Sequence, residues 1–179
     1  MPKPSKLPKL STILPFLLLF VMGSVMFVLL APENFVGPES QDRSPKIPTG
    51  AEPATVNFVH DGDTLFVTTH DDDNLKVRLL GVDTPELDEC YGEEATDFLR
   101  DLLPEGTTLY TVTDVEPVDQ YGRALLMAWT ANGQLVNLEL VASGHAEAVF
   151  IGENRLYQDE FEAAEDAAQA SSLGIWGEC

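Results

Sequence analysis

The sequence has few basic residues. Its 179 residues include ten Lys and Arg against 30 Asp and Glu, which gives a formal net charge of −20 and a pI near 4.2. Proteins that bind nucleic acid usually carry a basic surface patch, and an acidic surface repels polyanions. Charge therefore argues against a nucleic-acid protein, although it says nothing about the fold. Hydrophobic residues make up 44% of the chain, so the sequence is not an acidic disordered tail.

One long apolar run stands near the N-terminus. It spans residues 12–31 without a charge and follows a basic lead that contains Lys3, Lys6 and Lys9. About 20 apolar residues suffice to cross a bilayer as a helix, and lysines on one side only predict a cytoplasmic N-terminus and an external remainder. The apolar region of a cleaved signal peptide is usually about 7–15 residues long. We therefore expect a single-pass signal anchor in the cell membrane, with secretion as the alternative if the segment is cleaved.

Cysteine is scarce, with Cys90 and Cys179 the two present. Outside the cytoplasm, an even number of cysteines in a small domain favours a disulfide. The alternative is two free thiols.

The length allows one globular domain plus a tail, and no internal repeat is present. Residues 1–31 form the basic lead and predicted transmembrane anchor, or signal peptide. Residues 32–53 hold five prolines among Ser, Glu and Asp, which is typical of an extended linker. Residues 54–179 are expected to fold.

Hydrophobic periodicity within residues 54–179 predicts three strands, a helix, two strands and two helices, in that order. This order favours an α+β fold, a small five-stranded barrel that carries about three helices. The Asp-rich stretch at 71–74 is expected to form a hairpin turn. The expected strands are 55–60, 64–69, 75–81, 107–115 and 124–130, and the expected helices are 93–103, 135–142 and 156–171.

The first polar cluster is the sequence from Asp61 to Thr64, in which Asp61 and Asp63 flank a glycine. Ca²⁺ binds several oxygen ligands at about 2.3–2.6 Å, so two acids at the start of a strand suit a hard cation. An Asp-Gly pair is also an ordinary turn. By itself this cluster favours the turn.

The second cluster surrounds Arg78, which lies in an otherwise apolar strand where an unpaired charge is costly. Asp83 and Glu86 follow, on either side of a Thr-Pro pair. If Asp63 and Asp83 meet across the sheet, a metal gains two carboxylates, with the Thr84 carbonyl as a further ligand. Glu86 would then reach a water molecule. The alternative is a structural ion pair between Arg78 and a nearby acid.

The third cluster runs from Asp119 to Arg123 in a predicted loop. Arginine binds phosphate oxygens through two parallel hydrogen bonds, which lysine cannot do. Phosphoryl chemistry depends largely on positioning and charge stabilisation. Considered alone, however, Arg123 is best explained as an exposed loop residue.

Together and in this order, the clusters resemble the staphylococcal nuclease (thermonuclease) family. The resemblance covers nearly all of residues 54–179, and three spaced motifs in the correct order are a specific signal. The segments that carry it are Asp61-Gly62-Asp63-Thr64, Arg78-Leu79-Leu80-Gly81-Val82-Asp83-Thr84-Pro85-Glu86 and Asp119-Gln120-Tyr121-Gly122-Arg123, supported by Leu135-Val136-Asn137 and Gly174-Ile175-Trp176.

The resemblance implies an OB-fold barrel and Ca²⁺-dependent hydrolysis of DNA, RNA or both, with 3′-phosphate ends as the product. By motif, Asp63 and Asp83 would bind calcium together with the backbone carbonyl of Thr84. Asp61 would lie just behind these ligands. We expect a monomer that acts on nucleic acid outside the cytoplasm.

The resemblance also assigns roles around the phosphate. Arg78 and Arg123 would hold it and stabilise the charge that develops during cleavage. Glu86 would act on the attacking water as a general base or as an orienting acceptor. Tyr121 would lie beside the substrate.

Several features depart from the family pattern. From residue 54 onward the chain has five basic and 26 acidic residues, whereas the characterised secreted enzymes are basic. Gln120 stands where the family motif often has lysine, and Phe150 and Gly152 stand where the best-known members have tyrosines. A non-catalytic OB-fold module that binds nucleic acid or protein is the alternative function. Retention of the acids and both arginines argues against it.

Overall fold

The structure is a computed structural model that describes residues 45–71 and 73–179. The predicted anchor and most of the predicted linker lie outside the described residues. Among the helices of the described part, none combines the length and the apolar character needed to cross a membrane.

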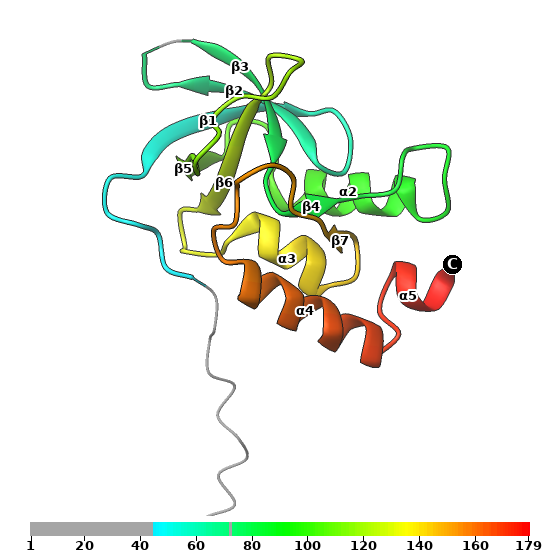
Figure 1. Cartoon of the computed structure of the whole chain (residues 1–179). Helices are drawn as coiled ribbons and strands as arrows, with labels where there is room; N and C mark the ends of the chain where they lie inside the picture. The colour runs from blue at the N-terminus through cyan, green and yellow to red at the C-terminus, as the bar shows by residue number, and fades with distance from the viewer. Residues whose placement is uncertain (1–44, 72) are drawn as a thin grey trace, which may run out of the picture. The chain divides into compact units, whose positions relative to one another are not determined.

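Five strands close into a barrel in the order β1-β2-β3-β6-β5 (Figure 1). β3 and β6 run parallel, and every other neighbouring pair is antiparallel. A closed five-stranded barrel with this strand order is the OB-fold, so the predicted fold class is confirmed. The strands are β1 Glu52–Val59, β2 Thr64–Thr69, β3 Asn74–Leu79, β5 Thr108–Val112 and β6 Ala124–Thr130.

Alternation along β2 and β3 separates the core from the outer face of the barrel. Leu65 and Val67 point inward with Val77 and Leu79, and each is at most 1% exposed. Burial of these apolar side chains is the main favourable term in folding. The residues between them point outward, and cross-strand pairing sets Thr64 opposite Arg78 and Phe66 opposite Lys76.

Helices α2 (Gly92–Leu102), α3 (Val136–Ala142) and α4 (Gln158–Ala170) account for the three expected helices. α3 lies between the barrel and α4 (Figure 1). Its buried Asn137 donates to the carbonyls of Leu80 and Leu126 and accepts from the Ala128 N–H, at 2.9–3.0 Å. The Asn137 side chain therefore holds α3 against β6 and against the residue that follows β3.

Two short elements were not expected from periodicity. β4 (Val82–Asp83) pairs with β7 (Glu147–Ala148), and a one-turn helix, α5 (Ile175–Glu178), ends the chain. A pair of two-residue strands shows too little alternation to be recognised in the sequence. This pairing carries Asp83 at the end of β4.

Cys90 and Cys179 form a disulfide, with Cα atoms 6.0 Å apart. The expected disulfide is therefore confirmed. It joins the segment before α2 to the C-terminal residue, across 89 positions of sequence.

Residues just before the predicted domain boundary also contact the barrel. The indole Nε1 of Trp129, which is fully buried, donates to the Pro45 carbonyl at 2.7 Å. Ile47 packs against the core.

Candidate active site

The turn between β1 and β2 is built around Asp61. Its Oδ1 accepts from the Thr64 N–H at 2.7 Å and from the Asp63 N–H at 3.2 Å. Asp and Asn side chains commonly close turns in this way. A Cβ on Gly62 would lie 2.6 Å from Oγ1 of Thr84, so the glycine lets the two polar segments pack together.

Asp63 is buried at the end of this turn, with 7% of its surface exposed. Its Oδ2 accepts from the N–H and the hydroxyl of Thr84 at 3.3 and 3.2 Å, and its Oδ1 accepts from the Thr64 hydroxyl. Burial raises the pKa of Asp63, and the nearby Asp61 charge adds to this effect. The charge of Arg78 and the hydrogen bonds oppose it without cancelling it.

Arg78 connects the two predicted metal ligands. Its Nη2 lies 3.0 Å from Oδ2 of Asp63 and 2.7 Å from Oδ1 of Asp83. Because one nitrogen contacts both oxygens, those oxygens lie at most 5.7 Å apart, the sum of the two distances. The two acids therefore meet as the sequence predicted. The alternative prediction, an ion pair of Arg78, is also observed.

The other terminal nitrogen of Arg78 is held by the backbone. Nη1 donates to the carbonyls of Leu79 and Val82 at 2.9 and 2.7 Å. Charge-assisted hydrogen bonds at both nitrogens fix the orientation of the guanidinium. This arrangement needs the planar fork of arginine.

The oxygen ligands suit a hard divalent cation. Asp63 is buried and held by Thr84, whereas the Asp83 side chain is 61% exposed, so a cation bound between them would keep water. Hard cations accept such a mixture of carboxylate, carbonyl and water oxygens. Within residues 45–71 and 73–179, no cluster of three or more His, Cys, Asp or Glu side chains is suited to a metal.

Arg123 is positioned by a turn that Asp119 closes. Oδ1 of Asp119 accepts from the N–H groups of Tyr121 and Arg123 at 2.9 Å, and Oδ2 accepts from Nε of Arg123 at 2.6 Å. The Tyr121 ring centroid lies 5.6 Å from Cζ of Arg123, within cation–π range. The Nη1 and Nη2 atoms of Arg123 make no hydrogen bond with any residue that the structure describes.

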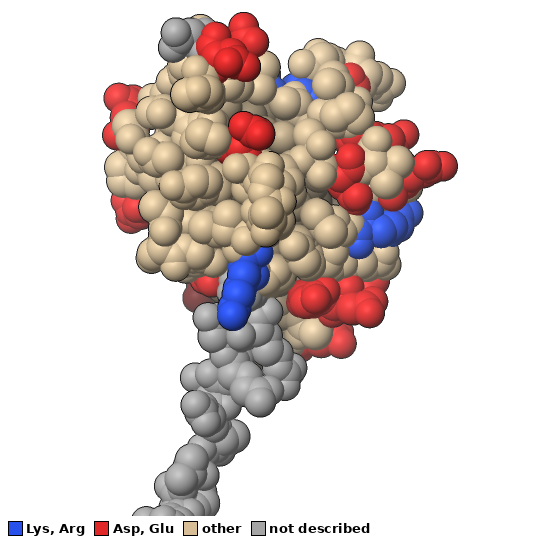
Figure 2. Space-filling model, turned by 90° about the vertical axis from the view of Figure 1, so that its left-hand side faces the viewer, with Lys and Arg blue, Asp and Glu red and all other residues tan. Residues whose placement is uncertain are grey.

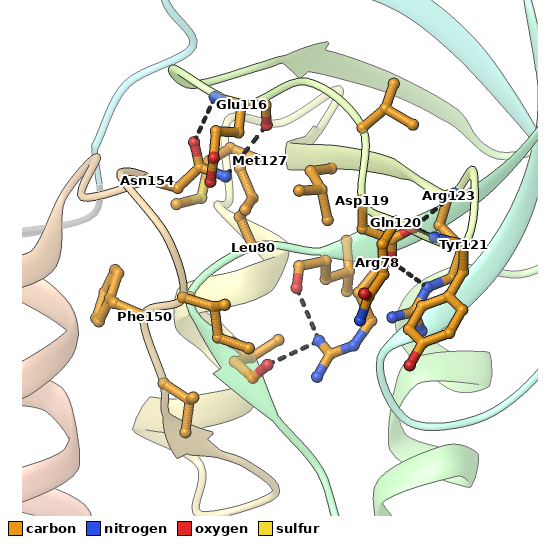
Figure 3. A pocket seen from close by; sticks show the side chains of 17 residues that line it. Arg78, Leu80, Glu116, Asp119, Gln120, Tyr121, Arg123, Met127, Phe150 and Asn154 are labelled. Carbon is orange, nitrogen blue, oxygen red and sulfur yellow. Dashed lines mark hydrogen bonds and ion pairs between the residues drawn. The ribbon is translucent and has the colours of Figure 1, made fainter.

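Both arginines line one cavity of about 340 Å³. Figure 3 shows Arg78, Arg123 and Tyr121 at one end of it, and Phe150 with Glu116 and Asn154 at the other. A phosphate at the first end would meet two cations, and a base toward the second end would meet the aromatic ring of Phe150.

Two residues that line this cavity, Glu116 and Asn154, were not predicted from the sequence. The amide of buried Asn154 pairs with the backbone of Glu116, with hydrogen bonds of 2.8 and 3.1 Å. This pair fastens the segment that follows β7 to the segment that follows β5. The two residues are 38 positions apart, so no local pattern marks them.

Among the predicted site residues, Glu86 has a side chain with no partner in the site. It is exposed and does not line the cavity. Its N–H donates to Oε2 of Glu89 at 3.0 Å, and a Cβ on Gly92 would lie 1.9 Å from its carbonyl oxygen. The start of α2 thus fixes the Glu86 backbone, while the Glu86 carboxylate makes no hydrogen bond or ion pair within the described part of the chain.

Known proteins resemble this chain over more than half of its length. Residues 76–178 match the family model described as Staphylococcal nuclease homologue. The chain belongs to this family. Endonuclease YhcR of Bacillus subtilis (strain 168) is 34% identical over 148 residues, which are 75% of this chain and 12% of that protein. Thermonuclease of Staphylococcus intermedius is 35% identical over 127 residues, which are 68% of this chain and 74% of the relative.

A second thermonuclease, from Staphylococcus hyicus, is 35% identical over 124 residues, which are 66% of this chain and 72% of that protein. The chain therefore spans most of each thermonuclease and a small part of YhcR. Family membership agrees with the resemblance seen in the three polar clusters, and the structure brings two of those clusters together around Arg78.

Proposed function

We propose that this chain is a Ca²⁺-dependent nuclease that hydrolyses phosphodiester bonds of DNA, RNA or both and leaves 3′-phosphate ends. The observation that carries the proposal is the convergence of Asp63 and Asp83 on Arg78, beside a cavity that Arg123 also lines. Membership of a family with relatives named thermonuclease and endonuclease supports the same activity.

The metal ligands would be Asp63, Asp83 and the backbone carbonyl of Thr84. When bound, Ca²⁺ supplies positive charge to a phosphate oxygen and makes a bound water more acidic. Asp61 shapes the turn that presents Asp63, and so acts on the metal site through the backbone.

The two arginines contribute to phosphate binding in different ways. Arg123 offers both terminal nitrogens, because its Nε alone is engaged by Asp119. A guanidinium held in this way can donate two parallel hydrogen bonds to one phosphate. Arg78 is fixed by backbone carbonyls at Nη1 and adds a second positive charge. Charge of this kind, oriented before the reaction, stabilises the charge that develops in the transition state.

Glu86 accepts the proton of the attacking water or orients that water, and the 5′ oxygen leaves. A carboxylate is a suitable acceptor in general base catalysis, and hydrogen bonds that serve catalysis are often long or absent without substrate. Glu86 reaches the phosphate through movement of its exposed side chain, while its backbone stays fixed against Gly92. Tyr121 packs on Arg123 and contacts the nucleotide.

We also propose that the domain works outside the cytoplasm as a monomer, anchored by residues 12–31 or released after their cleavage. The Cys90–Cys179 disulfide supports an oxidising compartment.

The test is cleavage of single-stranded DNA and of RNA by the full-length protein, purified in detergent, with Ca²⁺ and with a chelator. Ca²⁺-dependent cleavage that falls at least about 100-fold in Glu86→Gln supports the mechanism. Glu93→Gln, at an exposed acid in the first turn of α2, is the matched control. Products that become ligatable only after removal of a 3′-phosphate support the end chemistry. Binding without cleavage at any salt concentration favours the non-catalytic binding module.

A further inference from the structure

A partly exposed aromatic pair lies on the outer face of β1 and β2. Phe58 is 44% exposed, and its ring stacks on that of Phe66, with centroids 4.5 Å apart and planes 17° apart. Nζ of Lys76 lies 5.7 Å from the Phe66 centroid, and the His60 ring meets Phe66 edge-on at 6.3 Å. Large exposed aromatic groups are costly in water and often mark a binding surface.

A β-bulge is responsible for the outward direction of Phe58. The pairing of β1 with β2 shifts between Val56 and Phe58, so Val56 faces Val67 and Phe58 faces Phe66. Asn57 is the extra residue, and its side chain exchanges hydrogen bonds with Asn74 and Thr68. Without the bulge, strict alternation would put Phe58 on the same inward side as Val56.

The aromatic pair is continuous with the candidate active site. On β3, Lys76 pairs with Phe66, and Arg78 pairs with Thr64 one rung further along. Lys76 and Arg78 therefore point to the same outer face, about 6.6 Å apart along the strand at the usual rise per residue. Along this face, Lys76 therefore lies between the stacked rings and Arg78. Arg78 in turn contacts both candidate metal ligands.

We propose that Phe58, Phe66 and Lys76 form a stacking platform for a single-stranded segment of the substrate, outside the catalytic cavity. The proposal rests on the proposed nuclease function. Bases of the strand stack on the two rings, and Lys76 contacts a phosphate that lies between the rings and Arg78. Aromatic side chains bind single strands without sequence preference because every base has a π-face, and OB-folds commonly bind oligonucleotides on this part of the sheet.

The platform also resolves the conflict between the charge of the domain and its substrate. Figure 2 shows separate acidic patches around a broad uncharged area on the face drawn, with few basic side chains. Binding that depends mainly on phosphate contacts weakens steeply with salt. Stacking depends on apolar contact, so it holds a polyanion with few cations. A second copy of the chain is another occupant of this face, and the measurement of oligomeric state separates it from nucleic acid.

The experiment measures binding of fluorescein-labelled (dT)10 and (dT)2 by full-length Glu86→Gln protein, with and without Phe58→Thr/Phe66→Thr. Threonine keeps β propensity while it removes the rings. We expect about tenfold or greater weakening for (dT)10 and unchanged binding of (dT)2, which fills the catalytic cavity alone. Phe58→Tyr/Phe66→Tyr should restore the affinity, because the stacking surface returns. Leu173→Thr, at an exposed leucine elsewhere, is the control.

In the cleaving protein, the threonine pair should raise KM for long strands about tenfold and leave kcat unchanged. Three results overturn the platform. The threonine pair binds both oligonucleotides more weakly to the same degree, Leu173→Thr weakens (dT)10 binding as much as the threonine pair does, or the threonine pair binds (dT)10 as well as the parent protein. A shift of oligomeric state in the threonine pair with unchanged DNA binding also overturns it and indicates self-association. A protein that binds through the platform but never cleaves contradicts the proposed catalysis alone. A protein whose cleavage is insensitive to both substitutions contradicts the platform alone.

Discussion

Asp119 accepts a hydrogen bond from Nε of Arg123 at 2.6 Å, and the pair leaves the terminal nitrogens of Arg123 without a hydrogen bond to any described residue. We expect Asp119→Ala to lower kcat by about 10- to 100-fold, because a guanidinium displaced by about 1 Å no longer matches the phosphate. Steady-state kinetics on single-stranded DNA measure this. Asp97→Ala breaks the comparable surface pair with Arg100 and should leave kcat unchanged. Equal losses in both variants would contradict the positioning role.

The same ion pair predicts a pH dependence of stability. Burial disfavours ionisation of Asp119, but hydrogen bonds from Arg123 and Tyr121 outweigh it and hold the pKa of Asp119 below its ordinary value of 3.8. A carboxyl group whose pKa is lowered by folding stabilises the fold above its unfolded pKa, and this stabilisation is lost as pH falls through the folded pKa. The difference in unfolding free energy between wild type and Asp119→Asn should therefore be constant near neutral pH and shrink below pH 3.8. Urea titrations across this range measure it, and a difference that grows as pH falls contradicts the assignment.

Arg78 should not tolerate replacement by lysine. The guanidinium serves two carbonyls through Nη1 and two carboxylates through Nη2, whereas a single ammonium group cannot reach all four. Arg78→Lys should lower kcat by about 100- to 1,000-fold and lower the free energy of unfolding, since the buried Asp63 loses its fixed partner. Cleavage assays and denaturant unfolding measure the two effects. Arg100→Lys, at an exposed ion pair, should change neither quantity, and a fully active Arg78→Lys protein contradicts the role.

The disulfide should stabilise the fold and the segment that carries Glu86. Closure of a loop of 89 residues is worth about 4–5 kcal/mol in the loop-entropy model, and less where the unfolded chain keeps structure. The disulfide also borders a surface cavity that Asp83 and Thr84 line, so its removal should weaken Ca²⁺ binding too. Cys90→Ser/Cys179→Ser, compared with wild type in urea unfolding and in Ca²⁺ titration, measures both effects. Unchanged stability in the double variant contradicts the prediction.

The sequence predicted the barrel well because its strands are local patterns. Alternation in β2 and β3, with an Asp-rich connection between them, predicts a hairpin, and Thr68 pairs with Asn74 as such a hairpin requires. The β4–β7 pair and the Glu116–Asn154 contact were missed because each joins short segments far apart in the chain. Such contacts depend on how the whole chain packs.

The sequence predicted which residues belong to the candidate site better than it predicted how they are arranged. The sequence placed Asp63 and Asp83 together, and Arg78 meets both of them. It gave no sign that Nη1 of Arg78 would be held by two backbone carbonyls, nor that Glu86 would stand exposed in the segment before α2. The stacked Phe58 and Phe66 depend on a bulge of one residue, which alternation alone cannot predict.

Cleavage should persist or improve as salt rises toward molar concentration. The Debye length falls from about 10 Å at 0.1 M to about 3 Å at 1 M, so repulsion between the substrate and the distant acids, which outnumber basic residues 26 to five from residue 54 onward, is screened. Contacts of Arg78 and Arg123 with the phosphate act at shorter range, and stacking on Phe58 and Phe66 does not depend on charge. Initial rates on single-stranded DNA from 0.1 to 1 M KCl, at saturating Ca²⁺, measure this. The threonine pair at positions 58 and 66 should lose rate with salt more steeply than wild type, because it relies on phosphate contacts alone. A steep loss of rate in the wild type contradicts the prediction.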